Sequence, residues 1–385
     1  MIRNNDFSLE YINNLPCLLA HGQCAADRKK STFLNETGVF IWNLLSDDIA
    51  IEDIFNKCYE YFEIPEDERP NARRSIQSYM DTLCYSGMVI DKDFYQKFDL
   101  KKQLKLNIAG LCLNLYGKSE LFDDSFNDFE DDSFSCSEDR IQNIYVYHIA
   151  PVFHENGELI MRDKEVTVIK TDDRYIMTFP LWKYVEEVQI SFDGTKVSIY
   201  VNDPGNAKDE VFWAIRHAFL YFAGLHGLFA LHSVSVEYDN KALMFSAGSG
   251  IGKSTHAAIW TRLYGTRQIN GDLNLLGKDE NGLYHVYGMP WCGTSGIYDK
   301  ETYDIIGIVL LRQDPKNSIS HMKPEAKALA SLNRIISPMW TQKMAEDVLD
   351  FTKGLSSAIP IWNYNCNMTD DAAACIKAEI DKTIR

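Results

Sequence analysis

The fold of this chain is decided by the stretch Ala247-Gly248-Ser249-Gly250-Ile251-Gly252-Lys253-Ser254-Thr255. It follows an apolar run at 242–245, which is typical of a buried strand, and it precedes residues 256–263, which have helical spacing. The order of strand, glycine-rich loop, Gly-Lys-Ser and helix predicts a phosphate-binding P-loop. Glycines allow backbone N–H groups to point into one concavity, and the helix N-terminus adds unpaired donors and the positive end of its dipole.

Each part of this loop has an expected role. Lys253 would reach the β- and γ-phosphates of a nucleotide, and the Ser254 hydroxyl would hold Mg²⁺. The usual first glycine of the pattern is replaced by Ala247. A chance glycine turn before a helix is the alternative, but the strand context and the intact Gly-Lys-Ser favour a P-loop. The expected phosphate-binding residues are Gly248, Ser249, Gly250, Ile251, Gly252, Lys253, Ser254 and Thr255.

Length and composition narrow the class of protein. A chain of 385 residues is too long for one compact core, so we expect two domains, with a third left open. The formal charge of -16 at pH 7 disfavours nucleic acid and anionic membranes as partners, because phosphates would be repelled. No apolar run approaches the roughly 18 residues of a membrane helix, and residues 1–6 carry no signal-peptide pattern. The scattered cysteines form no Cys-x-x-Cys pair, which indicates reduced thiols and a cytoplasmic protein.

The first 90 residues combine short strands with amphipathic helices. Asn13-Asn14 is a turn signal between two strands, Asn35 is the expected N-cap of the first helix, and Gly87 ends the last one. Together these patterns predict a compact, winged-helix-like module. The expected strands are 7–12, 17–20, 31–35 and 88–90, and the expected helices are 36–45, 51–61 and 72–85.

This module resembles the PqqD-like peptide-recognition domains, over residues 5–92. The resemblance is carried by Phe33-Leu34-Asn35-Glu36-Thr37-Gly38-Val39-Phe40-Ile41-Trp42-Asn43-Leu44-Leu45 and by Leu83-Cys84-Tyr85-Ser86-Gly87-Met88-Val89. Such domains bind the leader segment of a ribosomally made precursor peptide by β-strand addition. The resemblance therefore implies a recognition domain over residues 1–97 and a precursor peptide as partner.

By the same resemblance, the peptide groove would lie between the strand at 31–34 and the helix at 72–85. Arg73, Arg74 and Gln77 are candidates for its rim. A winged helix that only dimerises or packs internally is the alternative. DNA binding is disfavoured, because the module has several acidic residues and no basic recognition helix.

A polar linker at 92–102 leads to a second domain over residues 102–385. An alternating strand is expected at 104–115, and strands separated by turns at 145–201, of which Asp193-Gly194 is a hairpin signal. The acidic run at 120–132 is interpreted as a solvated loop held by phenylalanines, since its carboxylates lack calcium-ligand spacing. Residues 206–224 form a very apolar helix, which we expect in the core.

Two polar residues flank the P-loop in the sequence. His232 lies on the strand at 229–236, which turns directly into the P-loop strand. Asp272 follows the strand at 266–269, at the position where a phosphotransferase needs a carboxylate to organise Mg²⁺ or to accept a proton. A structural histidine and a turn aspartate are the alternatives.

Leu231-His232-Ser233, the P-loop and the acidic strand end resemble the HPr kinase/phosphorylase family, over residues 102–365. That family is a P-loop group related in fold to the ATP-dependent phosphoenolpyruvate carboxykinases. The resemblance implies ATP and Mg²⁺ as cofactors, His232, Lys253 and Asp272 as catalytic residues, and Ser254 and Asp272 as metal ligands. The family carries two adjacent aspartates, whereas Gly271 stands at the first position here. Three alternatives follow. Asp272 both organises Mg²⁺ and accepts the proton, another residue such as Asn270 or His232 assists it, or catalysis is lost.

Later segments supply weaker candidates. Trp291, Thr294 and Ser295 lie in a glycine-rich loop and could contact nucleotide or acceptor, whereas Cys292 is interpreted as a packed thiol. Arg312 ends the buried strand at 305–311 and could neutralise phosphate or be a surface arginine. Arg334 lies between the helices expected at 323–333 and 340–355 and is a weaker candidate of the same kind.

The expected fold class is α+β or α/β, with a winged-helix-like PqqD module followed by an HPr kinase-like P-loop domain. The expected function is an ATP-dependent kinase that captures a ribosomally synthesised precursor peptide and phosphorylates a serine, or a threonine, in it. The alternatives are a non-catalytic, nucleotide-dependent peptide chaperone and a phosphotransferase that acts on a small molecule. GTP or pyrophosphate as donor and a homo-oligomeric state stay open.

Overall fold

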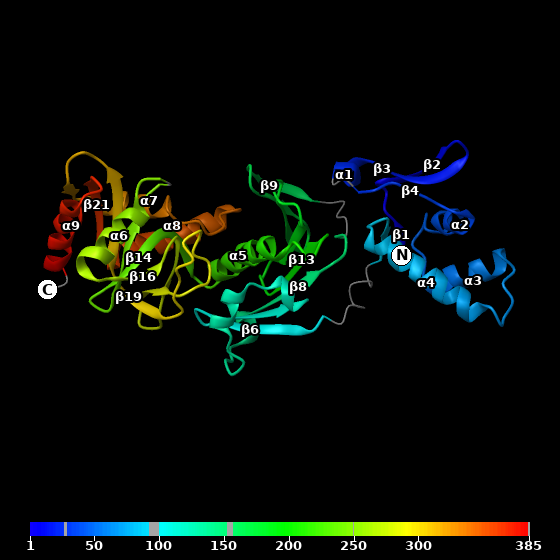
Figure 1. Cartoon of the computed structure of the whole chain (residues 1–385), viewed down its shortest axis with the longest axis horizontal. Coiled ribbons are helices and arrows are strands. Elements are labelled where there is room, and N and C mark those ends of the chain that lie inside the picture. The colour runs from blue at the N-terminus through cyan, green and yellow to red at the C-terminus, as the bar shows by residue number, and fades with distance from the viewer. Residues whose placement is uncertain (27–28, 92–99, 152–156, 249, 384–385) are drawn as a thin grey trace.

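The computed structural model describes residues 1–26, 29–91, 100–151, 157–248 and 250–383. Over these ranges the chain is a mixed α/β protein with large mixed sheets. Figure 1 shows three parts in a row, which we call the N-terminal module (residues 1–91), the middle sheet (102–201) and the C-terminal lobe (229–383). Most of the linker expected at 92–102 lies outside the described residues.

The N-terminal module has the helices and strands that its sequence predicts. Asn13 and Asn14 adopt positive φ values of 49° and 65° at the predicted turn. The Asn35 side chain accepts a hydrogen bond from the Gly38 N–H at 2.8 Å, which confirms the predicted N-cap. The elements are β1 (Ile2–Arg3), β2 (Phe7–Ile12), β3 (Leu15–Ala20), α1 (Gly22–Ala26), β4 (Thr32–Phe33), α2 (Glu36–Leu44), α3 (Ile51–Tyr61), α4 (Arg69–Tyr85) and β5 (Val89–Ile90).

These elements close around one apolar core that continues onto the middle sheet. Strands β2, β3 and β4 form a small antiparallel sheet, and β5 returns to pair with β1. Trp42, Phe55 and Met80 are buried in the core, together with Tyr147 and Tyr200 of the middle sheet. Because the two parts share this core, the N-terminal module is held against the rest of the chain.

The middle sheet has eight strands in the order β6-β7-β8-β13-β12-β11-β10-β9. The antiparallel pairing of β12 with β13 confirms the Asp193-Gly194 hairpin. Phe122, Phe126 and Phe129 are buried, as predicted for the acidic loop. The elements are β6 (Lys102–Ile108), β7 (Leu111–Tyr116), η2 (Ser119–Leu121), η3 (Asp124–Phe129), η4 (Glu138–Arg140), β8 (Ile141–Tyr147), β9 (Glu158–Arg162), β10 (Thr167–Lys170), β11 (Arg174–Thr178), β12 (Val185–Ser191) and β13 (Lys196–Val201).

One strand prediction was wrong. The alternation at 104–115 does not mark a single strand, because the chain reverses between β6 and β7, which pair with each other. Ala109 and Gly110 have φ values of 55° and 75°, which bend the chain into a two-residue turn. The apolar residues fall at positions 104, 106 and 108 before the turn and at 111, 113 and 115 after it. The alternation therefore shifts by one residue at the turn, which is a signal that the single-strand prediction missed.

The C-terminal lobe contains a closed ring of strands. Strand β14 (Phe229–Tyr238) pairs with β17 near its start and with β15 near its end. Strand β19 (Thr302–Gln313) pairs with β18 at its start and with β15 over the residues that follow. These two long strands therefore close the path β14-β15-β19-β18-β17. The remaining elements are β15 (Lys241–Ser246), α6 (Lys253–Tyr264), β16 (Arg267–Asn270), β17 (Leu273–Lys278), β18 (Tyr284–Tyr287), β20 (Ser318–Ser320), α7 (Pro324–Leu332), α8 (Gln342–Ala358), β21 (Ile361–Cys366) and α9 (Asp370–Thr383).

Helices cover both faces of this lobe. Leu243 and Phe245 of β15 pack in one cluster with residues of α6 and α9, whereas Ala242 and Met244 pack in another with residues of α8. Helix α5 (Lys208–Leu225) contacts strands of the middle sheet and also β14. Its buried face forms one cluster that reaches from the middle sheet to Trp291, so the two sheets share a core.

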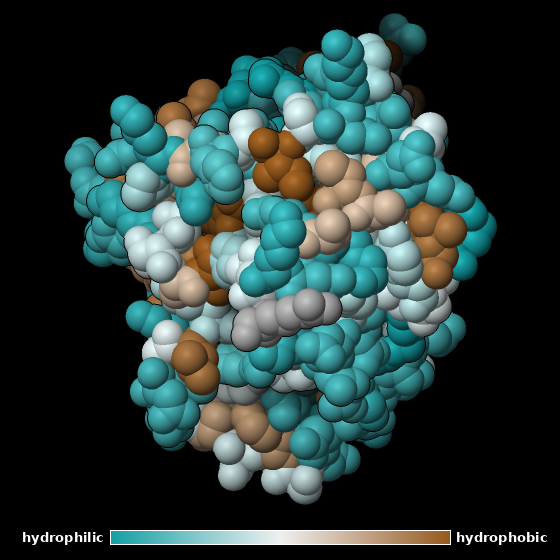
Figure 2. Space-filling model, turned by 90° about the vertical axis from the view of Figure 1, so that its left-hand side faces the viewer, coloured by the Kyte–Doolittle hydropathy of each residue, from teal (hydrophilic) through white to brown (hydrophobic). Residues whose placement is uncertain are grey.

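The outer end of the C-terminal lobe is mainly hydrophilic (Figure 2). Among the helices of the described ranges, none has the length and apolar character that crossing a membrane requires. Figure 2 shows the end of the molecule that the C-terminal lobe forms, which is mainly hydrophilic with small, separated hydrophobic patches.

Candidate functional site

The glycine-rich loop follows β15 at the carboxyl edge of the parallel strands β15, β19 and β21. Gly250 and Gly252 have φ values of 75° and 105°, which favour glycine, and α6 begins at Lys253. A Cβ on Gly252 would also lie 2.7 Å from the Met368 sulfur. Lys253 folds back over the loop, with its Nζ 3.5 Å from the Ala247 carbonyl oxygen. Ser249 lies outside the described residues.

The start of α6 presents polar groups to solvent. The His256 N–H donates to the Gly252 carbonyl at 2.9 Å, which leaves the preceding N–H groups of the first turn without a helical acceptor. Ser254 and Thr255 are exposed in this turn, and Gly250 is exposed in the loop. An exposed helix N-terminus of this kind can bind an anion.

His232 and Asp272 lie side by side, although 40 residues of sequence separate them. The Nε2 of His232 is 3.2 Å from Oδ1 of Asp272, and the side chains are 28% and 35% exposed, so a ligand can reach both. Two features hold this arrangement: the Ser233 N–H donates to the Asp272 carbonyl at 3.0 Å, and the Asn270 side chain accepts from the Asp272 and Leu273 N–H groups. Asn270 is buried, and its side chain is used to hold this turn.

The charge of Asp272 is stabilised by its surroundings. The hydrogen bond from His232 lowers the pKa of Asp272, and the charges of His232, Lys253 and Arg216 lower it further, against the opposing effect of burial. Burial lowers the pKa of Lys253, Asp272 raises it and Arg334 lowers it. His232, Lys253 and Arg216 thus all favour the ionised form of Asp272.

The two candidate arginines differ in position. Arg334 is half-buried next to the loop: its Nη1 lies 3.9 Å from where a Cβ on Gly248 would be, and its carbonyl accepts the His232 N–H at 2.9 Å. Arg312 is exposed at the end of β19. Arg334 therefore lies closer to the loop than its rank as the weaker candidate suggested, whereas no side-chain hydrogen bond or ion pair among the described residues links Arg312 to the loop.

Gly271 has no room for the side chain that the family pattern would place there. A Cβ on Gly271 would lie 1.9 Å from the Ser295 Oγ and 2.4 Å from the Ser295 Cβ. Gly293, with φ of 64°, lies against the neighbouring carboxylate, since a Cβ there would be 2.8 Å from the Asp272 Cβ. The turn at 292–296 therefore occupies the volume of a first aspartate, and only one carboxylate fits.

Other predicted residues have structural roles. Trp291 is fully buried, stacks on Phe219 at 5.1 Å and donates its Nε1–H to the Phe212 carbonyl at 3.1 Å. The expectation that it contacts a ligand was wrong, because the apolar face of α5 covers it. Cys292 is buried and burial raises its pKa, which agrees with a packed thiol. Thr294 and Ser295 are exposed.

Arg216 is the residue that the sequence interpretation missed. It lies on α5, which was assigned to the core as a whole, yet its charge acts on Asp272. One signal was present: after the charged first turn, it is the one Asp, Glu, Lys or Arg residue of the helix. Such a residue needs a partner or a ligand.

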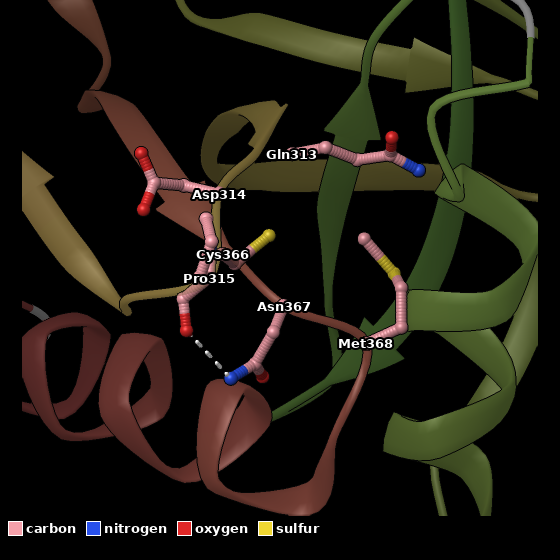
Figure 3. A pocket seen from close by; sticks show the side chains of 6 residues that line it. All are labelled: Gln313, Asp314, Pro315, Cys366, Asn367 and Met368. Carbon is pink, nitrogen blue, oxygen red and sulfur yellow. Dashed lines mark hydrogen bonds between the residues drawn. The ribbon is translucent and has the colours of Figure 1, made fainter.

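A pocket of ≈ 320 Å³ opens at the carboxyl ends of β19 and β21 (Figure 3). Asn367 is held in its wall, because its Nδ2 donates to the Pro315 carbonyl at 3.3 Å. Met368 joins the pocket to the glycine-rich loop through its approach to Gly252. The lining residues are Gln313, Asp314, Pro315, Cys366, Asn367 and Met368.

The residues predicted for the rim of a peptide groove lie on α4. Arg73 is exposed, makes an ion pair with Glu52 of α3 and covers the Phe55 ring at 4.4 Å, so it joins two helices. Gln77 donates to Asp81 at 2.8 Å within α4. The sheet itself ends at β4, which pairs with β3, and Leu19 and Phe33 are 44% and 59% exposed on it.

Known proteins were compared with this chain. No protein-family model matches it, and no curated protein matches it.

Proposed function

We propose that this protein is an ATP-dependent phosphotransferase whose active site combines the glycine-rich loop with His232 and Asp272. The observation that carries the proposal is the clustering of polar groups at the glycine-rich loop in a chain of net charge -16. Lys253 folds over the loop, Arg334 lies beside Gly248, and His232 contacts Asp272 at 3.2 Å. Against an acidic background, such a site suits a polyanion such as a nucleoside triphosphate. The resemblance to the HPr kinase/phosphorylase family supports the same assignment.

The residues have distinct roles in the proposed transfer. The loop N–H groups and Lys253 hold the phosphates. The acceptor hydroxyl oxygen attacks the γ-phosphorus, the bond from that phosphorus to the β-γ bridging oxygen breaks, and ADP leaves. The hydroxyl proton passes to the His232–Asp272 pair, whose side chains lie 3.2 Å apart. Arg334 lies beside the loop, where its charge offsets that of the phosphates.

Magnesium fits this set of donors. Ser254 and Asp272 would supply a hydroxyl and a carboxylate, and the exposure of both leaves room for water. In the part of the chain that the structure describes, no group of three or more His, Cys, Asp or Glu side chains could hold a metal. The remaining ligands would be phosphate oxygens and water, as is usual for Mg²⁺, which neutralises phosphate charge when bound.

The proposed acceptor is a serine, or a threonine, of a ribosomally made peptide that the N-terminal module captures. The edge of the sheet at β4, with Leu19 and Phe33 exposed, supports capture by strand addition. The shared core with the middle sheet supports it as well, since a fixed module raises the effective concentration of the acceptor.

The test is a mass measurement on short precursor peptides from the same gene neighbourhood, incubated with the full chain and ATP·Mg²⁺. We expect one added phosphate, which Lys253→Met and Asp272→Asn abolish. Nucleotide binding without any mass change would reject transfer to a peptide.

A second candidate is a nucleotide-dependent peptide chaperone without catalysis. Gly271 favours it, because the turn at 292–296 excludes a second carboxylate. It predicts that ATP and peptide bind, that neither changes in mass, and that a partner enzyme modifies the peptide only when this protein is present.

A further inference from the structure

Arg216 lies on a helix that connects the two sheets. Helix α5 packs on β8, β12 and β13 of the middle sheet and on β14 of the C-terminal lobe. After Glu210, Arg216 is the only Asp, Glu, Lys or Arg residue of the helix. A guanidinium in this position is unusual for a core helix and asks for a reason.

The packing of α5 directs Arg216 toward the site. Phe212 and Phe219 both contact the Trp291 ring, with centroids 5.9 Å and 5.1 Å away. Arg216 is four residues after the first and three before the second, so it lies on the same face of the helix. Trp291 starts the turn whose Gly293 touches Asp272. Arg216 therefore approaches the Asp272 turn from the side of the middle sheet.

The guanidinium is incompletely satisfied. Its Nε is buried and has no hydrogen-bond partner among the residues that the structure describes, and no described carboxylate lies within 4.0 Å of the group. The Trp213 ring covers it at 4.5 Å. Its neighbour His217 adds no positive charge, because burial lowers the pKa of that imidazole to about 3 and leaves it neutral. The guanidinium is half-buried; burial lowers its pKa, and the charges of Asp272 and Glu165 oppose that shift. A buried N–H without a partner costs free energy, so the unsatisfied Nε favours an anionic ligand that can accept from it.

We propose that Arg216 binds the terminal phosphate of the nucleotide, so that the active site is completed by the middle sheet. The inference rests on the proposed function and names a ligand contact for it. A planar guanidinium can hold two phosphate oxygens at once, which a lysine cannot. With Lys253 and Arg334 on the loop side, the phosphoryl group would lie between cations from two parts of the chain.

The test compares ATP with ADP, because only ATP carries the terminal phosphate. Calorimetric titration of the full chain measures both affinities in wild type, Arg216→Met, Arg216→Gln and the surface control Arg312→Met. We expect the Arg216 variants to bind ATP at least about tenfold more weakly and ADP within about twofold of wild type. Arg312→Met should bind both nucleotides as wild type does.

A second readout separates ligand binding from a structural role. Without nucleotide, the Arg216→Met variant should unfold at the same temperature as wild type or higher, since it removes a buried N–H that has no hydrogen-bond partner among the described residues. If both neutral variants fail to fold, Arg216→Lys keeps the charge and should still lower the ratio of ATP to ADP affinity at least about threefold.

Each outcome bears on one of the two proposals. An unchanged ratio of ATP to ADP affinity in the folded variants overturns the role of Arg216 and leaves the proposed function intact. Equal weakening of ATP and ADP also overturns it, because the contact would then not be to the terminal phosphate. A wild-type chain that binds neither nucleotide refutes the proposed function itself.

Discussion

Gly271 provides a quantitative test of how tightly the 292–296 turn is packed on the site. A Cβ there would be 1.9 Å from the Ser295 Oγ, and ordinary contact begins at 3.4 Å, so Ser295 must move by roughly 1.5 Å. That movement breaks the hydrogen bonds of its Oγ with the Cys292 carbonyl (2.7 Å) and the Ile297 N–H (3.1 Å). Two lost bonds at about 1 kcal/mol each and overpacking of about 1–3 kcal/mol predict that Gly271→Ala lowers the free energy of unfolding by about 3–5 kcal/mol.

The cause can be isolated with a second substitution. Ser295→Gly removes the clashing atoms, and the nearest remaining neighbour of the new Cβ is then the Cys292 carbonyl oxygen at 3.4 Å. Gly271→Ala should therefore cost at least about 2 kcal/mol less in the Ser295→Gly background than in wild type.

The assay is urea denaturation of the full chain, followed by circular dichroism. Gly224→Ala in α5 is the control, because its nearest neighbour would be 3.8 Å away and alanine favours a helix. A Gly271→Ala protein within about 0.5 kcal/mol of wild type, or a loss that Ser295→Gly does not relieve, would refute the reasoning.

Three further predictions concern charge and pH. Lys253→Met should weaken ATP binding at least about tenfold in calorimetry without lowering the unfolding temperature; an unchanged affinity would contradict its assigned place on the phosphates. His232→Ala removes the main interaction that lowers the pKa of Asp272, so that pKa rises and the acid limb of the pH–rate profile moves to higher pH; a limb that stays in place would reject the coupling. Burial lowers the pKa of His256 from 6.5 to about 4, so the unfolded chain takes up a proton that the folded chain does not. This difference should lower the free energy of unfolding by about 3 kcal/mol as the pH drops from about 6.5 to 4. Urea denaturation at about pH 7 and about pH 5 should therefore show a smaller loss of stability in His256→Leu than in wild type. An equal loss in both proteins would argue against a role of His256.

Much of the fold could be predicted because it follows from local chemistry. The Asn35 cap, the Asn13-Asn14 turn and the hairpin at Asp193-Gly194 depend on residues a few positions apart, and the structure has all of them. The order of strand, glycine-rich loop and helix at 241–264 is equally local. The one wrong strand, at 104–115, shows the limit of this approach, because the two-residue reversal shifts the alternation by only one residue and is easily missed.

The sequence by itself thus determined which segments form strands and helices, and it identified Lys253, His232 and Asp272 as chemically notable. Only the tertiary structure decided which of these side chains meet. The pairing of β14 with β17 brings His232 to Asp272 across 40 residues, and the 292–296 turn explains why Gly271 cannot be an aspartate. The same packing buries Trp291 and turns Arg216 of a core helix toward the site. These contacts depend on how distant elements close around a shared core, and no local pattern of residues encodes that.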